Sequence, residues 1–151
     1  TFGPRQSARA VIPTIISQLA SGKSIIELGD ISTSRDFNFV TDTCLGLISI
    51  MKSESCYGET VNIGSGVEVK IIELAKKISD LMNKEVIIAQ DEKRLRPEKS
   101  EVTRLLSNIN KIQGLTGYCP KYSLEEGLKD TIAWFLDPGN LKKYKTDIYN
   151  V

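Results

Sequence analysis

The stretch LGDISTSRDFNFVTD, residues 28–42, guides the interpretation of the whole chain. A Gly-Asp pair ends an apolar run, and a loop of small polar residues follows it. The aromatic residues after this loop alternate with other residues, a pattern that predicts a half-buried strand over residues 37–40. Arg35 therefore stands at the predicted entrance of a strand, where a rigid element would hold its side chain in place.

An arginine at such a position has two interpretations. Its planar guanidinium can donate two parallel hydrogen bonds to a phosphate, which the ammonium of a lysine cannot do with the same geometry. The alternative is a surface ion pair with the neighbouring Asp36, a common arrangement that contributes little stability. Both interpretations are compatible with Arg35 and Asp36 taken alone.

Four motifs in order carry a resemblance to a known family. The motif at 28–42 comprises Gly29, Asp30, Arg35, Asp36, Phe37, Val40 and Asp42. It resembles the Gly-Asp turn, short loop and Arg-Asp-Phe-x-x-Val-x-Asp of the extended short-chain dehydrogenase/reductase family of nucleotide-sugar epimerases and dehydratases. Residues 3–6 (Gly-Pro-Arg-Gln), 62–66 (Asn-Ile-Gly-Ser-Gly) and 94–98 (Arg-Leu-Arg-Pro-Glu) match in the same order, so the resemblance covers residues 2 to about 136.

This resemblance implies an α/β fold. The chain would be the C-terminal part of an extended Rossmann-type fold, with short strands and packed helices and without the nucleotide-binding Rossmann half. In the family, Thr1 would lie at the end of a central strand, so we expect a fragment of a longer protein. Residues 1–136 would form a nucleotide-sugar substrate-binding domain and residues 137–151 a C-terminal tail.

The resemblance also implies a binding site. Arg35 and Arg96 would hold the diphosphate of a nucleotide sugar, and the proline after Arg96 fixes an extended backbone that presents its side chain. Arg94 competes with Arg96, because residues two apart in an extended segment point the same way. Ala10, Val11 and Leu28 would lie against the nucleotide base; plain core positions are the alternative for these three apolar residues.

The catalytic residues of the family have no match in this chain. Relatives bind NAD on a glycine-rich turn and use a Tyr-x-x-x-Lys pair, and neither motif occurs here. We therefore expect NAD to be bound by the missing N-terminal half and this fragment alone to be inactive. Its expected partners are a nucleotide-diphospho sugar, its own N-terminal Rossmann half and, in the intact enzyme, a second subunit of a homodimer.

The nearest likeness within the family is to 4,6-dehydratases that act on nucleotide-linked N-acetylglucosamine in bacterial surface-polysaccharide synthesis. A 4-epimerase of the same fold is one alternative, and a non-catalytic nucleotide-binding module is another. The length and composition suit one domain, since 151 residues with 40% hydrophobic and 26% charged side chains can bury a core. An odd number of cysteines without a disulfide framework suits the reducing cytoplasm. A net charge of +1 predicts neither nucleic-acid nor membrane-surface binding. Three cysteines without histidine form no zinc-ligand pattern, so no metal site is expected.

Hydrophobic periodicity places the elements. Helices are predicted over residues 8–19, 41–52, 71–82, 108–114 and 124–136, and strands over 25–28, 37–40, 59–63, 85–89 and 100–106. Thr41 or Asp42 would cap the second helix, which is predicted to be largely buried. Ser123 and Glu126 form a capping box. Gly64 and Gly66 are interpreted as residues of a positive-φ turn and not as a phosphate cradle.

Overall fold

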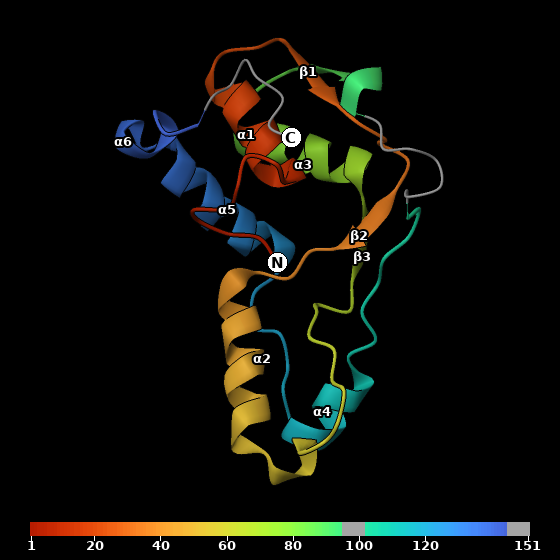
Figure 1. Ribbon diagram of the computed structural model, residues 1–151. Helices are drawn as coiled ribbons and strands as arrows, with labels where there is room; N and C mark the ends of the chain where they lie inside the picture. The colour runs from red at the N-terminus through yellow and green to blue at the C-terminus, as the bar shows by residue number, and fades with distance from the viewer. Residues whose placement is uncertain (95–101, 145–151) are drawn as a thin grey trace.

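The computed structural model describes residues 1–94 and 102–144 (Figure 1). Its helices are α1 (Val11–Ala20), α2 (Val40–Lys52), α3 (Ile71–Leu81), α4 (Asn110–Thr116), α5 (Leu124–Leu136) and α6 (Pro138–Leu141), with short 3-10 helices η1 (Glu54–Cys56) and η2 (Glu92–Arg94). Its strands are β1 (Ile25–Leu28), β2 (Ser34–Asp36), β3 (Glu68–Lys70) and β4 (Ile87–Gln90).

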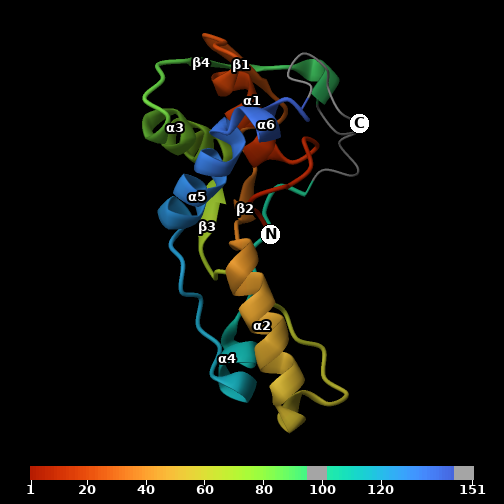
Figure 2. The same ribbon diagram turned by 90° about the vertical axis from the view of Figure 1, so that its left-hand side faces the viewer.

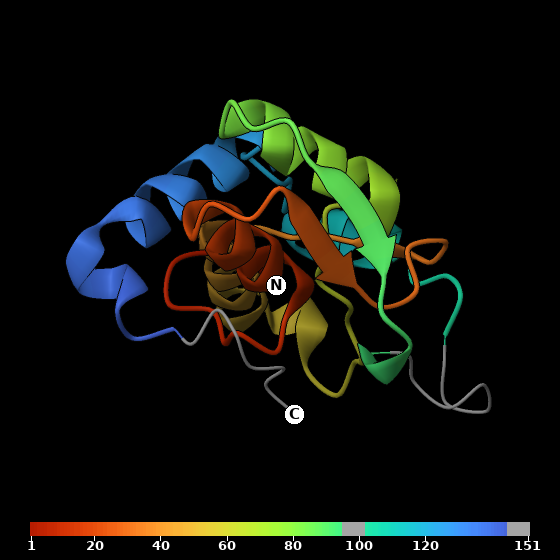
Figure 3. The same ribbon diagram turned by 90° about the horizontal axis from the view of Figure 1, so that it is seen from above.

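The strands form two small sheets. β1 and β4 pair in parallel, with Ile25 opposite Ile87, and Figure 3 shows them running side by side in the same direction. β2 and β3 pair antiparallel, with Ser34 opposite Lys70. A parallel pair needs a crossover connection, and here the chain between the two strands includes α2 and α3. The second sheet thus lies within this connection.

One hydrophobic core holds the body of the molecule together. Helices α1, α3 and α5 pack around it in the part of the molecule that also carries β1 (Figures 1 and 2). The fully buried side chains at its centre are Ile12, Ile15, Ile16, Leu19, Ile26, Leu74, Ile78, Leu128 and Phe135. They recur at helical spacing, so each helix turns one apolar stripe inward. This burial confirms the stripes that the sequence predicted for α1, α3 and α5.

Helix α2 leaves this body and extends away from it, with α4 along one side (Figures 1 and 2). Gly46 lies on the packed side of α2, where a Cβ added to it would lie 2.8 Å from the Ile63 side chain. On the other side Leu47, Ile48 and Met51 are 52%, 45% and 79% exposed. The prediction of a largely buried helix is wrong, because periodicity identifies an apolar face but not whether anything covers it.

Two carboxylates of the 28–42 motif fix the junction between body and extension. Asp36 accepts hydrogen bonds from the amides of Ser65 (2.9 Å) and Gly66 (3.0 Å) and from the Ser65 hydroxyl. Asp42, fully buried, accepts from the amides of Lys121 and Tyr122, both at 3.0 Å. These bonds satisfy backbone donors of two distant loops. The two aspartates therefore act as structural cross-links.

The 28–42 motif differs locally from its prediction. The strand lies at Ser34–Asp36 and not at residues 37–40, so Arg35 lies within a strand and not at its entrance. Phe39 makes only an isolated parallel bridge with Phe2, and α2 already begins at Val40. The Asp42 side chain is committed to the junction, and the N-cap of α2 is Phe39, without a side-chain hydrogen bond.

Elsewhere most predicted elements are present. β1, α3 and the Ser123–Glu126 capping box are confirmed, and α1, α4, α5 and β4 lie within a few residues of their predicted positions. Residues 59–63 form no strand, and β3 forms instead at Glu68–Lys70 because β2 supplies its partner. The described part of the predicted strand at 100–106 makes a single bridge, Arg104 with Ser34. In the predicted tail, α6 forms and Asp137 caps it. No helix in the described ranges has the length and apolar character needed to cross a membrane.

Candidate functional site

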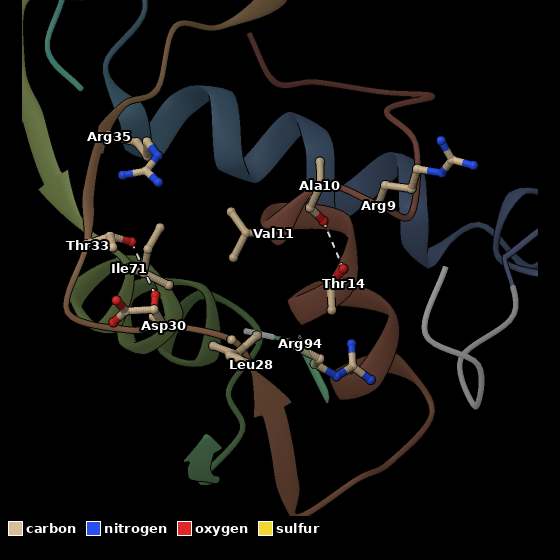
Figure 4. Close-up of a pocket in the computed structure, with 11 residues that line it drawn as sticks. Arg9, Ala10, Val11, Thr14, Leu28, Asp30, Thr33, Arg35, Ile71 and Arg94 are labelled. Carbon is tan, nitrogen blue, oxygen red and sulfur yellow. Dashed lines mark hydrogen bonds between the residues drawn. The ribbon is translucent and has the colours of Figure 1, made fainter. Parts of the chain in front are cut away.

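A cavity of about 230 Å³ opens between the start of α1, the end of β1 and β2 (Figure 4). Its lining comes from segments far apart in the chain, namely Arg9, Ala10, Val11, Thr14, Leu28, Gly29, Asp30, Thr33, Arg35, Ile71 and Arg94. In Figure 4, Val11 lies between Arg35 and Thr14. Only the folded chain brings these residues together.

The first turn of α1 forms one wall. The Thr14 hydroxyl donates to the carbonyl oxygens of Ala8 (3.0 Å) and Ala10 (2.9 Å), which fixes the chain as it enters the helix. Ala10 is the N-cap and offers no side-chain acceptor, and the first turn has no acidic residue. This end of α1 therefore keeps the partial positive charge of a helix N-terminus.

The loop after β1 forms the floor. Gly29 is required there by close approach, since a Cβ on it would lie 2.6 Å from the Arg94 carbonyl oxygen. The Thr33 hydroxyl donates to the Asp30 carbonyl at 3.2 Å, and the Ile71 amide donates to the Thr33 carbonyl at 3.0 Å. These bonds connect the loop to the start of α3. Because the Ile71 amide donates to the loop, this N-terminal amide of α3 is not available to bind an anion.

Positive charge predominates among the described residues that line the cavity, with three arginines against one carboxylate. Arg35 is half-buried and donates from Nη1 to the Ser34 carbonyl at 2.7 Å, while Arg94 donates from Nε to Asp91 at 3.1 Å. Bonds from the Ser32 hydroxyl and amide, with a smaller contribution from the charge of Arg35, lower the pKa of Asp30. The Asp30 carboxylate is therefore ionised at neutral pH, and it accepts hydrogen bonds from Ser32 of its own loop.

Four of the five predicted binding residues line this cavity: Arg35, Ala10, Val11 and Leu28. The fifth, Arg96, lies outside the described residues, and its competitor Arg94 lines the cavity. That these residues bind ligand stays a prediction. Sequence reasoning did not name Arg9, Thr14, Thr33 or Ile71. The first two follow from proximity to Ala10, one residue and one helical turn away, whereas Ile71 reaches the cavity only through tertiary packing.

The Gly64-Ser65-Gly66 turn does not fit a dinucleotide. A Cβ on Gly64 would lie 2.6 Å from an Asp36 carboxylate oxygen and 2.4 Å from the Ser107 Cβ, so this glycine serves close packing. Gly66 has a φ of 73° and provides the predicted positive-φ turn. With the Asp36 carboxylate bonded to the amides of Ser65 and Gly66, the turn cannot cradle a phosphate as a dinucleotide-binding loop does.

Comparison with known proteins identifies the family of this chain. The family model described as GDP-mannose 4,6 dehydratase matches residues 1–131. The chain belongs to this family of nucleotide-sugar dehydratases and epimerases. It is 31% identical over 144 residues to the dTDP-glucose 4,6-dehydratase of Neisseria gonorrhoeae, covering 90% of this chain and 41% of that protein.

Solved structures of the family have the same fold. Epimerase Mth375 from Methanothermobacter thermautotrophicus superimposes with a TM-score of 0.81 at 34% identity, covering 94% of this chain and 42% of the epimerase. The dTDP-glucose 4,6-dehydratase of Bacillus anthracis, solved in complex with NAD, gives a TM-score of 0.75 at 28% identity, covering 89% and 41%. The predicted fold class and the NAD dependence of the family are confirmed. The chain spans about two-fifths of the length of these relatives.

Proposed function

We propose that the cavity at the start of α1 binds the nucleoside-diphosphate part of a nucleotide sugar. The observation that carries this proposal is the convergence of Arg35, Ala10, Val11 and Leu28, predicted as binding residues from separate motifs, on one cavity with an excess of positive charge. The charged and the apolar residues of its lining complement the two parts of such a ligand.

The diphosphate belongs at the charged side. Arg35 projects from a paired strand, and a guanidinium held in this way can make charge-assisted bonds to two phosphate oxygens. The uncapped start of α1 adds backbone donors and a favourable dipole. The base belongs between the apolar side chains of Val11, Leu28 and Ile71, which offer van der Waals contacts to its faces without competing charge.

The cavity is too small for a whole nucleotide sugar. Sites that enclose ligands of that size measure roughly 300–1,000 Å³, compared with about 230 Å³ here. We infer that the sugar and NAD are held by the part of the longer protein that the relatives carry outside the matched region. The uncovered apolar face of α2, formed by Leu47, Ile48 and Met51, supports a packed partner of this kind.

For the longer protein we propose a 4,6-dehydratase that converts a nucleotide-diphospho-N-acetylglucosamine into its 4-keto-6-deoxy product, in bacterial surface-polysaccharide synthesis. This chain would contribute binding energy on the diphosphate, a handle remote from the reacting carbons, which can hold the sugar while its ring reacts. The reacting groups would come from outside this chain, and the chain alone would be inactive. The intact enzyme would be a cytoplasmic homodimer.

Product mass tests the reaction. Intact protein from the full reading frame, supplied with NAD, is incubated with UDP-, GDP- and dTDP-linked sugars, including N-acetylglucosamine. Loss of one water from the sugar supports the dehydratase. An isomer of unchanged mass supports the 4-epimerase; the similar protein Mth375 is named an epimerase. If the full protein binds a nucleoside diphosphate but turns over none of these sugars, the result supports the non-catalytic nucleotide-binding module.

A further inference from the structure

A second cavity lies between the Gly-Pro-Arg-Gln loop and the end of the chain's last long helix. Its volume is about 610 Å³, and its lining is Arg5, Ser7, Ala8, Trp134, Asn140, Lys143 and Tyr144. It shares no lining residue with the cavity at the start of α1. The nucleotide-sugar proposal therefore makes no use of it.

Specific bonds hold the walls of this cavity. The Tyr144 hydroxyl donates to the Gln6 carbonyl at 3.0 Å, across 138 residues of chain. The Asn140 side-chain amide donates to the Trp134 carbonyl at 3.1 Å. The rings of Trp134 and Tyr144 meet nearly perpendicular with centroids 6.1 Å apart. The cavity is thus built by contacts between the loop and the helix end, and its aromatic wall has a defined orientation.

Arg5 has a strained backbone. Its φ is 66°, a left-handed conformation that residues with a Cβ adopt rarely and at a cost. Glycine would occupy this position without that cost. Strain of this kind concentrates at functional sites, where it fixes a side chain that the site needs. Here the strained residue, Arg5, is one of the two cations among the described lining residues.

The charges of the cavity are unbalanced. Arg5 and Lys143 are both exposed cations, and no carboxylate is among the described residues that line the cavity. Within residues 1–94 and 102–144, neither cation has an ion-pair partner. The nearby Asp137 is committed to capping α6 through the amides of Gly139 and Asn140. Two cations without an ion-pair partner in the described part of the chain, beside an indole ring and an amide, suit an anion that carries a flat ring.

We propose that this second cavity binds a nucleoside monophosphate, with its phosphate on Arg5 and Lys143 and its base against Trp134. The Asn140 side chain and the Ser7 hydroxyl supply polar groups for the base edge and the ribose. The site is separate from the substrate cavity, so a mononucleotide there could be bound together with the nucleotide sugar.

Tryptophan fluorescence reads this site directly, because Trp134 is the only tryptophan in the chain. The chain is excited at the red edge of the indole band and titrated with uridine or adenosine monophosphate, with ribose 5-phosphate and with inorganic phosphate. We expect a saturable change with a nucleotide, weaker binding of ribose phosphate and the weakest of inorganic phosphate. Equal affinity for all three ligands would show that the base makes no contact with Trp134. It would overturn the proposal of a nucleotide site in favour of a site for phosphate alone.

Substitutions at Arg5 separate binding from folding. Arg5→Gly removes the guanidinium and also relieves the backbone strain, so it should raise the melting temperature and weaken nucleotide binding on the order of tenfold or more. Lys142→Ala, an exposed neighbour outside the lining, is the matched control and should bind normally. Arg35→Ala should also leave the signal unchanged. Normal binding by Arg5→Gly, or loss of the signal in Arg35→Ala, would overturn the proposal.

Discussion

Helices α1 and α2 carry similar apolar side chains in opposite surroundings. In α1, Ile15, Ile16 and Leu19 are fully buried against α3 and α5, whereas in α2 Ile48 and Met51 are 45% and 79% exposed. The body around α1 has a complete core within this chain. The extension around α2 has only one packed side. The body around α1 thus has a core of its own, whereas one apolar side of α2 is exposed, and we propose that a part of the longer protein packs against it.

One substitution made in both helices tests this contrast most strongly. Ile16→Ala should lower the free energy of unfolding by about 2–5 kcal/mol, because it removes buried methylenes and leaves a cavity. Ile48→Ala should change it by about 0.5 kcal/mol or less, because the side chain is half in water and alanine is the better helix former. Urea unfolding of the two variants measures both values. Equal losses would mean that α2 is packed within this chain.

The junction between the two regions gives the next largest effect. Asp42→Ala leaves the part-buried amides of Lys121 and Tyr122 without their acceptor and should cost about 2–4 kcal/mol, with Asn retaining part of the stability. Asp80→Ala, at an exposed position of α3, is the control and should stay within about 0.5 kcal/mol of the unsubstituted chain. A loss no larger than that of the control would show that Asp42 does not cross-link the regions.

Ligand binding should depend on the body. Arg35→Ala should weaken binding of a nucleoside diphosphate by about 1.5–3 kcal/mol, on the order of tenfold to a hundredfold, and Arg35→Lys should recover little, because the two-pronged donor is lost. Arg104→Ala is the control, since Arg104 pairs with Glu68 and does not line the cavity. Calorimetry on the full-length protein measures the three affinities.

The same titration chooses between Arg94 and Arg96. We keep Arg96 as the second phosphate ligand, because Arg94 already donates to Asp91 and has a side chain only 13% exposed. Arg96→Ala should then weaken binding about as much as Arg35→Ala. Normal binding by Arg96→Ala together with loss in Arg94→Ala would reverse the assignment.

The smallest expected effect is on the uncovered face. Met51→Gln should leave the stability of this chain unchanged within about 0.5 kcal/mol, since the side chain is 79% exposed. In the longer protein the same change should lower the melting temperature, because a polar amide would be buried against an apolar partner. Thermal unfolding of both forms makes the comparison. No effect in the longer protein would show that this face stays open to solvent there.

Periodicity and motifs predicted the body well and the extension poorly. Ile12, Ile16 and Leu19 repeat at helical spacing, and their partners lie within this chain, so the predicted stripe and its burial agree. Leu47 and Met51 show the same pattern, but burial depends on what lies opposite, which a single helix does not encode. β3 was missed for a related reason, since Glu68–Lys70 becomes a strand only by pairing with β2.

The candidate site was partly predictable. Arg35, Ala10, Val11 and Leu28 were named from local motifs, and the fold places all four at one cavity. The roles of the two motif aspartates were not predictable, because Asp36 and Asp42 bond to backbone amides roughly 30 and 80 residues away. Local sequence therefore indicated the residues that line the cavity better than the residues that hold the surrounding loops in place.

Chemical-shift mapping shows which residues a nucleoside diphosphate contacts, and so tests whether it binds in the cavity at the start of α1. The isotope-labelled chain is titrated with UDP, GDP or dTDP at millimolar concentration, and backbone amide shifts are followed residue by residue. The nucleotide-sugar account predicts saturable shifts centred on Ala10, Val11, Leu28 and Arg35, which disappear in Arg35→Ala while the spectrum stays folded. Shifts confined to residues far from this cavity, or saturable shifts that Arg35→Ala leaves unchanged, would contradict it.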